Sequence, residues 1–177
     1  MKDIRVTPIR NGTVIDHLPA GSALYVLRIL GYYRNDNPMS KTTSVLMHAP
    51  SRKTVWKDLV KVEDLELVEK ERQKIALVAW TYRPRQMPTV NIIRNYTVAE
   101  KTILEVAERY GGLVCCQNGL EEGGKSGCIS NNERWMEGTN LELRNDRFFC
   151  YYCGREQEPE RLRENLIRSP AAGRKVC

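Results

Sequence analysis

"FCYYCGRE", residues 149–156, contains Cys150 and Cys153 with two residues between them. Cysteines at this spacing occur in disulfides, in redox couples and in metal sites. The chain has 177 residues and six cysteines, all at or beyond residue 115. Its first residues lack the apolar run of a signal peptide, and no window is apolar enough for a membrane helix. We therefore expect a cytoplasmic protein, and because the cytosol keeps thiols reduced, a metal site is favoured over a disulfide.

The other cysteines offer a second pair for the same metal ion. Structural zinc is commonly held tetrahedrally by two close pairs of ligands. The first pair would combine Cys128 with Cys115 or Cys116 across the glycine-rich loop "QNGLEEGGKSG", residues 117–127, which is flexible enough for its ends to meet. Adjacent cysteines seldom both bind one tetrahedral ion, so one of Cys115 and Cys116 should be spare. Cys177 is interpreted as a free thiol without a role.

The segment that carries the cysteines is short of core residues. It has few large aliphatic side chains, and a unit this small usually needs a staple. Four thiolates around Zn²⁺ would supply one, so we predict one structural zinc ion per chain. "NLELRNDRFF", residues 140–149, predicts a hairpin that turns at Asn145 and Asp146, which gives a small β-rich zinc-binding domain. A thiol oxidoreductase is a weaker interpretation, since "CYYC" does not open a helix after a strand, as thioredoxin-like pairs do.

The first hundred residues alternate between strand and helix patterns. "RNG" (10–12) and "NDNP" (35–38) are turn signals, and helical spacing begins at Pro19. "IALVAW" (75–80) is apolar on both alternating faces, which is typical of a strand inside a sheet. In chain order we expect strands within 4–18, a helix from 19, strands at 43–49 and 54–63, a short helix at 64–74, and strands at 75–80 and 89–98. The order βαββαββ favours the α+β class, with an open antiparallel sheet and two helices on one face.

Charge and cysteine content both divide the chain near residue 104. Residues 1–104 carry 17 Lys plus Arg against 10 Asp plus Glu, whereas residues 105–177 carry 11 against 12. The basic excess favours a partner that bears phosphates, either nucleic acid or a small nucleotide. The sequence shows no histidine-backed nucleophile and none of the common glycine-rich phosphate loops, so we expect no catalysis. We predict two domains, residues 1–104 and residues 105–177.

Few residues mark a binding site by pattern alone. Strand alternation places Lys57 and Lys61 on one face, although such a pair more often lies on an exposed strand face than at a phosphate site. Asp16 and His17 are neighbours on a strand, so their side chains should point to opposite faces unless the strand ends there. These patterns leave the site open.

Several motifs occur together in the order found in one known family. They are "GTVIDHLPAG" (12–21), "KDLVKVE" (57–63), "TVNIIRNYTV" (89–98) with Lys101 beyond it, "LVC" (113–115), "CISNNE" (128–133) and the CxxC pair. In this combination the chain resembles the regulatory chain of aspartate carbamoyltransferase up to about residue 156. The resemblance implies a ferredoxin-like nucleotide-binding domain followed by a zinc-binding domain. It also implies a non-catalytic allosteric subunit of pyrimidine biosynthesis that pairs with a second regulatory chain and contacts a catalytic chain.

The resemblance implies roles for single residues. Asp16 and Lys61 would contact the ribose and base of an effector (CTP, ATP or UTP), and Lys101 would contact its phosphates. Carboxylates accept hydrogen bonds from ribose hydroxyls and ammonium groups are compact partners for phosphates, so the residue types suit these roles. The same pocket would be lined by His17, Lys57, Asn91, Tyr96 and Val98, with backbone groups around Ile9 at the base edge. Zinc would be held by Cys115, Cys128, Cys150 and Cys153, because "LVC" aligns Cys115 with the first ligand.

The chain departs from the family pattern in three places. Cys115 and Cys128 are separated by twelve residues, a longer spacing than the family's, in a loop that touches the catalytic chain in the family. The stretch 80–88 and the tail after Gln157 have no counterpart in the pattern, and in that tail Leu162 and Leu166 could lie on one side of a helix. The nucleotide that is preferred stays open.

A nucleic-acid-binding zinc ribbon is the alternative from another class. It would use the basic N-terminal part, but residues 105–177, which would form the ribbon, carry one more acidic than basic residue. Phosphate binding needs a basic surface, so this half is a poor match for the role. We therefore expect neither nucleic acid nor a membrane as a partner.

Overall fold

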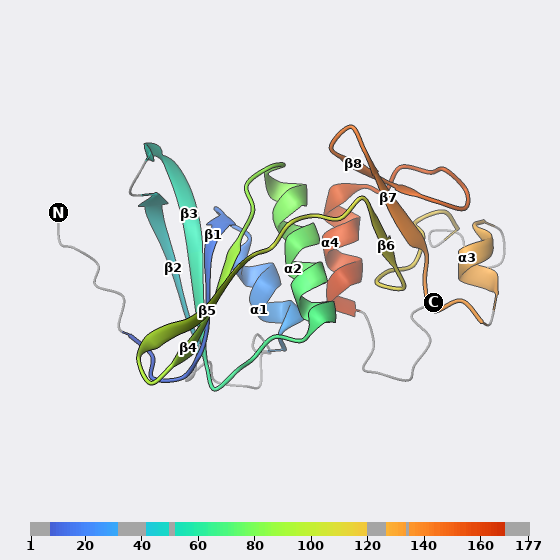
Figure 1. Cartoon of the computed structure of the whole chain (residues 1–177). Helices are drawn as coiled ribbons and strands as arrows, with labels where there is room; N and C mark the ends of the chain where they lie inside the picture. Colours follow the sequence, from blue (N-terminus) through green and yellow to red (C-terminus); the bar gives the residue numbers. More distant parts are fainter. Residues whose placement is uncertain (1–7, 32–41, 50–51, 120–126, 134, 169–177) are drawn as a thin grey trace.

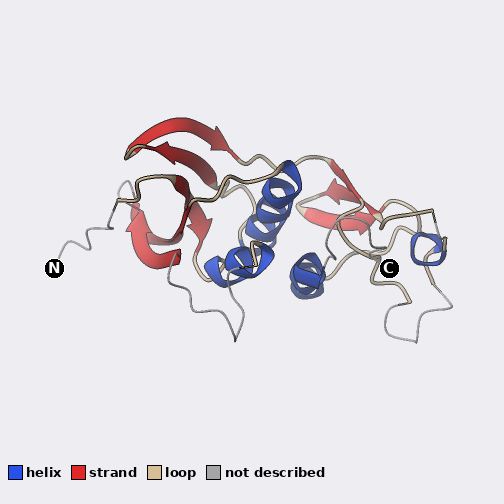
Figure 2. Cartoon of the chain, turned by 90° about the horizontal axis from the view of Figure 1, so that it is seen from below, coloured by secondary structure: helices blue, strands red, loops and turns tan. Residues whose placement is uncertain are grey.

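The computed structural model describes residues 8–31, 42–49, 52–119, 127–133 and 135–168 (Figure 1). Its strands form two antiparallel sheets, one of five strands and one of three. Both views show three helices between the two sheets (Figure 1, Figure 2): α1 (Ala23–Ile29), α2 (Glu69–Tyr82) and α4 (Pro159–Arg168). Among the described helices, none combines the length and apolar character needed to cross a membrane.

The larger sheet carries two helices on one of its faces. Its strands lie in the order β2 (Thr42–Ala49), β3 (Arg52–Glu63), β1 (Gly12–Pro19), β4 (Thr89–Arg94) and β5 (Thr97–Ile103). Ile15, Val60 and Ile92 point from its three inner strands into a core that they share with Val26 of α1 and Ile75 of α2. The predicted α+β class, with an antiparallel sheet and two helices on one face, is confirmed.

The stretch 75–80 is a helix, so the strand predicted there is wrong. α2 runs from Glu69 to Tyr82 and includes all of it, while the predicted helix at 64–74 starts only at Glu69. Residues 74–79 are buried without a break because α2 packs on the larger sheet and on the elements of the smaller one. A helix enclosed in this way is apolar on every side, and a short apolar run cannot distinguish it from a buried strand.

The predicted strand at 89–98 is in fact two strands. β4 and β5 form a hairpin whose turn residues, Asn95 and Tyr96, have φ of 50° and 65°. The order βαββαββ is therefore correct, although its last two strands are not the predicted ones. The beginning of the first predicted strand falls on residues 1–7, outside the described residues.

Glycine is needed where β1 begins. Gly12 has φ of 142°, and a Cβ atom there would collide with the carbonyl oxygen of Val62 on β3. The "RNG" stretch thus brings the chain into the sheet at a position that only glycine fits.

The smaller sheet contains β6 (Arg109–Gly111), β7 (Asn140–Arg144) and β8 (Arg147–Cys150), in that order. Asn145 and Asp146 form the turn between β7 and β8, both with positive φ, as predicted. The four-residue helix α3 (Ile129–Asn132) follows the glycine-rich loop. In α4, Leu162 and Leu166 are fully buried on one side, which confirms the helix expected in the tail.

A second core joins the two sheets. Leu77 and Val78 of α2 pack in one cluster with residues of both the smaller sheet and α4. Those partners are Tyr110, Leu113, Val114, Leu141, Phe148, Leu162 and Leu166. α2 therefore belongs to both cores, which fixes the smaller sheet relative to the larger one.

Candidate functional site

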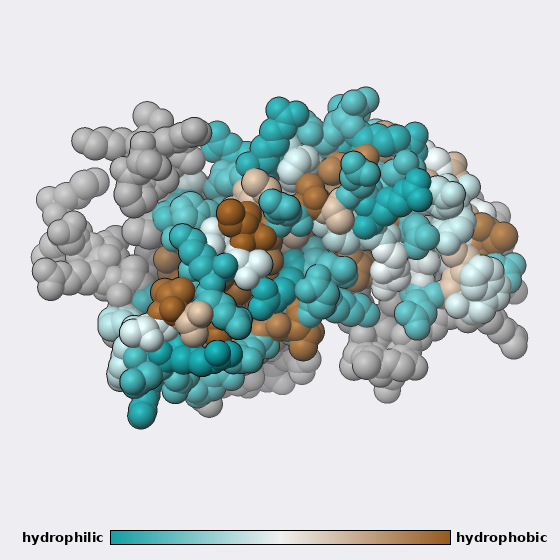
Figure 3. Space-filling view, in the orientation of Figure 1, coloured by the Kyte–Doolittle hydropathy of each residue, from teal (hydrophilic) through white to brown (hydrophobic). Residues whose placement is uncertain are grey.

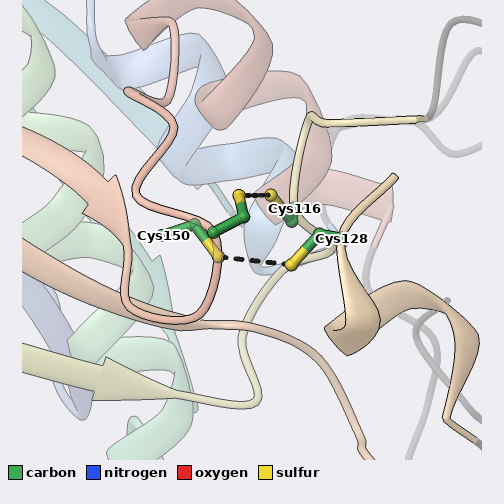
Figure 4. A group of neighbouring side chains, drawn as sticks. Cys116, Cys128 and Cys150 are labelled. Carbon is green, nitrogen blue, oxygen red and sulfur yellow. Dashed lines mark hydrogen bonds between the residues drawn. The ribbon is translucent and has the colours of Figure 1, made fainter. Parts of the chain in front are cut away.

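Four cysteine side chains converge beside the smaller sheet. The sulfur atoms of Cys116, Cys128, Cys150 and Cys153 all lie within 4.8 Å of one another. Two of the S–S distances, Cys116 to Cys153 and Cys128 to Cys150, are 3.6 Å. Figure 4 shows the side chains of Cys116, Cys128 and Cys150 turned toward a common centre. A tetrahedron of thiolates at the Zn–S distance of about 2.3 Å has edges of about 3.8 Å, so the cluster has the dimensions of a metal site.

Of the two adjacent cysteines, the structure brings Cys116 into this cluster. Cys115, the ligand implied by the resemblance, is not among the four. Cys116 is held by the amide of Asn131, which accepts a hydrogen bond from the backbone N–H of Cys116 and donates one to its carbonyl oxygen. The motif "CISNNE" thus contributes the ligand Cys128 and, three residues later, the amide that orients Cys116. Cys177 lies outside the described residues.

Two polar side chains that the sequence analysis did not single out lie against the cysteine cluster. The hydroxyl of Thr139 lies 2.9 Å from Cys150 Sγ, and that of Ser130 lies 3.1 Å from Cys128 Sγ. Hydrogen bonds to sulfur stabilise the thiolate form that binds metals. Ser130 is near its cysteine in the sequence, whereas Thr139 reaches Cys150 through the pairing of β7 with β8, which no spacing rule shows.

The pKa values of two cysteine thiols in the cluster are shifted in opposite directions. Hydrogen bonding from Cys116 and from Thr139 lowers the pKa of Cys150, although burial acts in the opposite direction. The pKa of Cys116 is raised, first by its hydrogen bond with Cys150 and then by burial. These hydrogen bonds therefore favour the thiolate form of Cys150.

A row of paired residues, polar except for Val14, crosses the face of the larger sheet that the helices do not cover. Lys61 of β3 pairs with Val14 of β1, Val14 pairs with Asn91 of β4, and Asn91 pairs with Lys101 of β5. Directly paired residues in an antiparallel sheet point to the same face. Since Ile15 is buried against the helices, its neighbour Val14 and the whole row face the other way. Lys61 is largely buried, and this burial lowers its pKa.

Asp16 and Lys57 form an ion pair on the same face, with 2.8 Å between Oδ1 and Nζ. The pairing of β1 with β3 shifts between Ile15 and Leu18, and His17 there has φ of 58°. This bulge breaks the strand alternation, so the two side chains lie near each other after all: His17 Nδ1 is 3.8 Å from Asp16 Oδ2, and the backbone N–H of His17 donates to Asp16 Oδ1 at 2.7 Å. The alternation argument fails because a bulge adds a residue to one strand.

The remaining residues implied for the nucleotide pocket lie at one end of the open face. Val98 of β5 pairs with Ile93, two residues along β4 from Asn91, and therefore points to the open face. Tyr96 is exposed in the β4–β5 turn, and its backbone N–H donates to the carbonyl oxygen of Arg10. Ile9 is buried next to this point. The structure thus places Asp16, Lys57, Lys61 and Asn91 on the inner strands of this face and Lys101 beside Asn91 on the edge strand β5, with Val98 and Tyr96 toward the β4–β5 turn.

Comparison with known proteins gives the same assignment for most of the chain. Residues 4–105 match the family model described as "Aspartate carbamoyltransferase regulatory chain, allosteric domain". The chain belongs to the aspartate carbamoyltransferase regulatory chain family. A regulatory chain from Methanothrix thermoacetophila is 42% identical over 173 residues, which cover 94% of this chain and 98% of that protein. One from Pyrococcus horikoshii is 41% identical over 167 residues, which cover 94% and 100%.

Membership in this family settles the class of function. The chain is a regulatory chain of aspartate carbamoyltransferase, and therefore a non-catalytic subunit whose partner is a catalytic chain. This confirms the predicted regulatory function and does not favour the nucleic-acid-binding alternative. The cysteine cluster supports the predicted metal site, with dimensions that suit a single ion.

Proposed function

We propose that this regulatory chain binds a nucleoside triphosphate on the open face of its larger sheet and transmits that binding to a catalytic chain through a zinc-stapled C-terminal domain. The observation that carries the proposal is the row from Lys61 to Asn91 and Lys101, with Asp16 and Lys57 beside it. Three lysines against one aspartate give this part of the face a positive charge, which suits phosphates. The proposal keeps the division expected from the sequence, with a ferredoxin-like nucleotide-binding domain in residues 1–104 and a zinc domain in residues 105–177.

The nucleotide would lie across the central strands. Asp16 accepts hydrogen bonds from the ribose hydroxyls, Lys61 contacts the ribose and base region, and Lys101 contacts the phosphates. The base edge meets backbone groups around Ile9, and the walls are His17, Lys57, Asn91, Tyr96 and Val98. CTP, ATP and UTP share the ribose and triphosphate that this arrangement recognises, so the effectors compete for one site.

Zinc is the ion that suits the cysteine cluster. A set of four thiolates is a soft, tetrahedral donor set, which selects zinc over Mg²⁺ or Ca²⁺. Cys116, Cys128, Cys150 and Cys153 would hold it, with Cys116 in place of Cys115. The ion closes the large loop between Cys116 and Cys128, and it fixes the ends of β8 and the start of α3 in a part of the chain with a small core.

The catalytic chain would dock at the end of the molecule that carries α3. Four large side chains there are exposed: Ile129, Trp135, Tyr151 and Tyr152. Apolar surface is visible at the α3 end in Figure 3, where most of the surrounding surface is hydrophilic. Exposed aromatic and aliphatic side chains of this kind are typical of interface cores. Two regulatory chains would pair and bridge catalytic chains in the cytoplasm.

Regulation then requires that the effector binds two quaternary states unequally. Coupling between sites of this kind is typically about 1–3 kcal/mol, which changes affinities several-fold to about a hundredfold. The nucleotide face and the cysteine cluster lie on opposite sides of α1 and α2, so coupling within the chain would run through the elements packed between them, α1, α2 and α4.

The direct test is the complex reconstituted from this chain and its catalytic chain. Aspartate saturation curves are measured with and without CTP, ATP or UTP, and nucleotide binding is measured by calorimetry. We expect at least one nucleotide to shift the curve, and Lys101→Met to abolish that shift while the metal content stays at one zinc per chain. Lys70→Met, which removes an exposed lysine from α2, serves as the control. Identical curves with and without every nucleotide would overturn the proposal.

A further inference from the structure

Two buried glutamines tie the cysteine cluster to the start of α4. Gln117, which follows the ligand Cys116, and Gln157, which closely precedes α4, are each 2% exposed. The backbone N–H of Gln117 donates to Gln157 Oε1 at 3.0 Å, and the side chain of Gln117 exchanges two hydrogen bonds with the backbone of Glu158. The two segments are therefore joined by three hydrogen bonds, one of them buried and two partly buried.

The side-chain amide of Gln157 also reaches a sulfur atom of the cluster. Its Nε2 lies 3.6 Å from Cys116 Sγ and donates a second hydrogen bond to the carbonyl oxygen of Arg155. A donor to a metal-bound thiolate orients the ligand and stabilises its charge. Gln157 thus contacts the metal centre through its amide N–H, while its amide oxygen holds Gln117.

α4 starts directly after this clamp and packs on the helices of the larger sheet. Leu162 and Leu166 are buried against Leu77 and Val78 of α2. The guanidinium of Arg163 lies over the ring of Tyr82, 4.2 Å from its centroid, and 5.6 Å from that of Tyr25. Glu164 accepts a hydrogen bond from the hydroxyl of Tyr25 on α1. Figure 1 shows α4 standing beside α2, between the two sheets.

We propose that Gln157 is the positioning residue that couples the metal centre to the larger sheet through α4. A single residue, Glu158, separates Gln157 from the first residue of α4, and its backbone is itself hydrogen bonded, so a shift of α4 on α1 and α2 moves the amide at Cys116. The reverse also holds, because a change at Cys116 moves the start of α4. This inference rests on the proposed metal site, but it does not depend on nucleotide binding.

A double-mutant cycle on metal release tests this coupling. The full-length zinc-loaded chain is mixed with excess chromogenic chelator, and the zinc release rate is measured for Gln157→Met, Arg163→Met and the double variant. We expect Gln157→Met to release zinc about tenfold faster, since loss of an outer hydrogen bond typically costs 10-fold to 100-fold in metal affinity. Arg163→Met should accelerate release in the wild-type background and have no further effect when Gln157 is already replaced.

The variants are chosen so that misfolding does not imitate the result. Methionine matches the length of Gln157 and keeps the inner aliphatic part of Arg163, whose Nε is buried without a hydrogen-bond partner among the described residues, so losing this Nε breaks no hydrogen bond. Gln73→Met, on the half-buried side of α2, is the matched control and should release zinc at the wild-type rate. Gln157→Glu, which turns a donor toward a thiolate into an acceptor, should release zinc at least as fast as Gln157→Met.

Cobalt substitution supplies a readout that a merely structural role would not move. Hydrogen bonding at a thiolate changes the energy of its charge transfer to Co²⁺, so the absorption band should shift in Gln157→Met but not in Gln73→Met. The inference is overturned if Gln157→Met and Gln73→Met behave alike, or if the effects of Gln157→Met and Arg163→Met simply multiply. A chain that binds no zinc at all would refute the metal site itself, which is a separate failure.

Discussion

Trp80 and Asp146 connect helix α2 of this regulatory chain to the smaller sheet. The indole Nε1 of Trp80 on α2 donates a hydrogen bond of 3.2 Å to the carbonyl oxygen of Asp146 in the β7–β8 turn. The turn needs positive φ at Asp146, so the position of its carbonyl group is fixed by the hairpin. Arg85 lies 3.6 Å from the Asp146 carboxylate, but this ion pair is exposed and adds little.

Replacing Trp80 by phenylalanine should loosen this connection. Trp80→Phe keeps an aromatic ring in place and removes the N–H donor, so we expect the free energy of unfolding to fall by about 1 kcal/mol. Urea denaturation of the zinc-loaded chain followed by circular dichroism measures this change. Trp135→Phe, at a highly exposed tryptophan, should leave it nearly unchanged. Equal effects of the two substitutions would show that the hydrogen bond does not contribute.

The choice between two adjacent cysteines gives the clearest test of the metal site. Cys116→Ser should abolish stoichiometric zinc and unfold the region around α3, because it leaves three thiolates for an ion that needs four ligands. Cys115→Ser should retain one zinc per chain, since Cys115 is not in the cluster. Metal analysis and circular dichroism of the purified variants measure both outcomes. Zinc retained by Cys116→Ser and lost by Cys115→Ser would reverse the assignment.

The buried lysine of α2 predicts how stability depends on pH. Burial, and the nearby charge of Lys70, lower the pKa of Lys74 from 10.5 to about 8. Between these two values the unfolded chain binds more protons than the folded chain, so the contribution of Lys74 to stability rises with pH in this window and is lost as the pH falls through about 8.

Lys74→Met should remove this pH dependence. At pH 7 the substitution no longer buries an ammonium group, so we expect the free energy of unfolding to increase by about 1–2 kcal/mol. Denaturation curves at pH 7 and pH 10 measure the effect, with Lys101→Met, at an exposed lysine of β5, as the control. A variant with the wild-type slope between these pH values would contradict the assignment to Lys74.

The sequence predicted the order of strands and helices in the larger sheet correctly, but not which residues form the last two strands. The stretch 54–63 is recognisable as a strand because β-branched residues are interleaved with charged ones, whereas 75–80 is enclosed on all sides and loses the period that separates a helix from a strand. The cysteine spacing revealed a metal site, but the choice of Cys116 depends on Asn131, a contact made by folding. Thr139 and Gln157 reach the sulfur atoms from distant parts of the chain, and local patterns carry no sign of such contacts.

Replacing Lys61 should weaken nucleotide binding without lowering the stability of the fold. Burial lowers the pKa of the Lys61 ammonium group. Keeping this group charged therefore costs free energy in the folded chain when no effector is bound. Lys61→Met removes the charge and keeps the aliphatic stem, so the free energy of unfolding should stay equal or increase. Nucleotide affinity should fall about 10-fold to 100-fold, as expected for the loss of a charge-assisted hydrogen bond.

Calorimetric titration with CTP and ATP, together with denaturation of the free chain, separates these two effects. Lys101 is exposed on β5, so Lys101→Met should weaken nucleotide binding without changing stability. If Lys61→Met lowered stability and affinity together, the lysine would be a structural part of the sheet. If it left affinity unchanged, the nucleotide would have to bind elsewhere than on the row that joins Lys61 to Asn91 and Lys101.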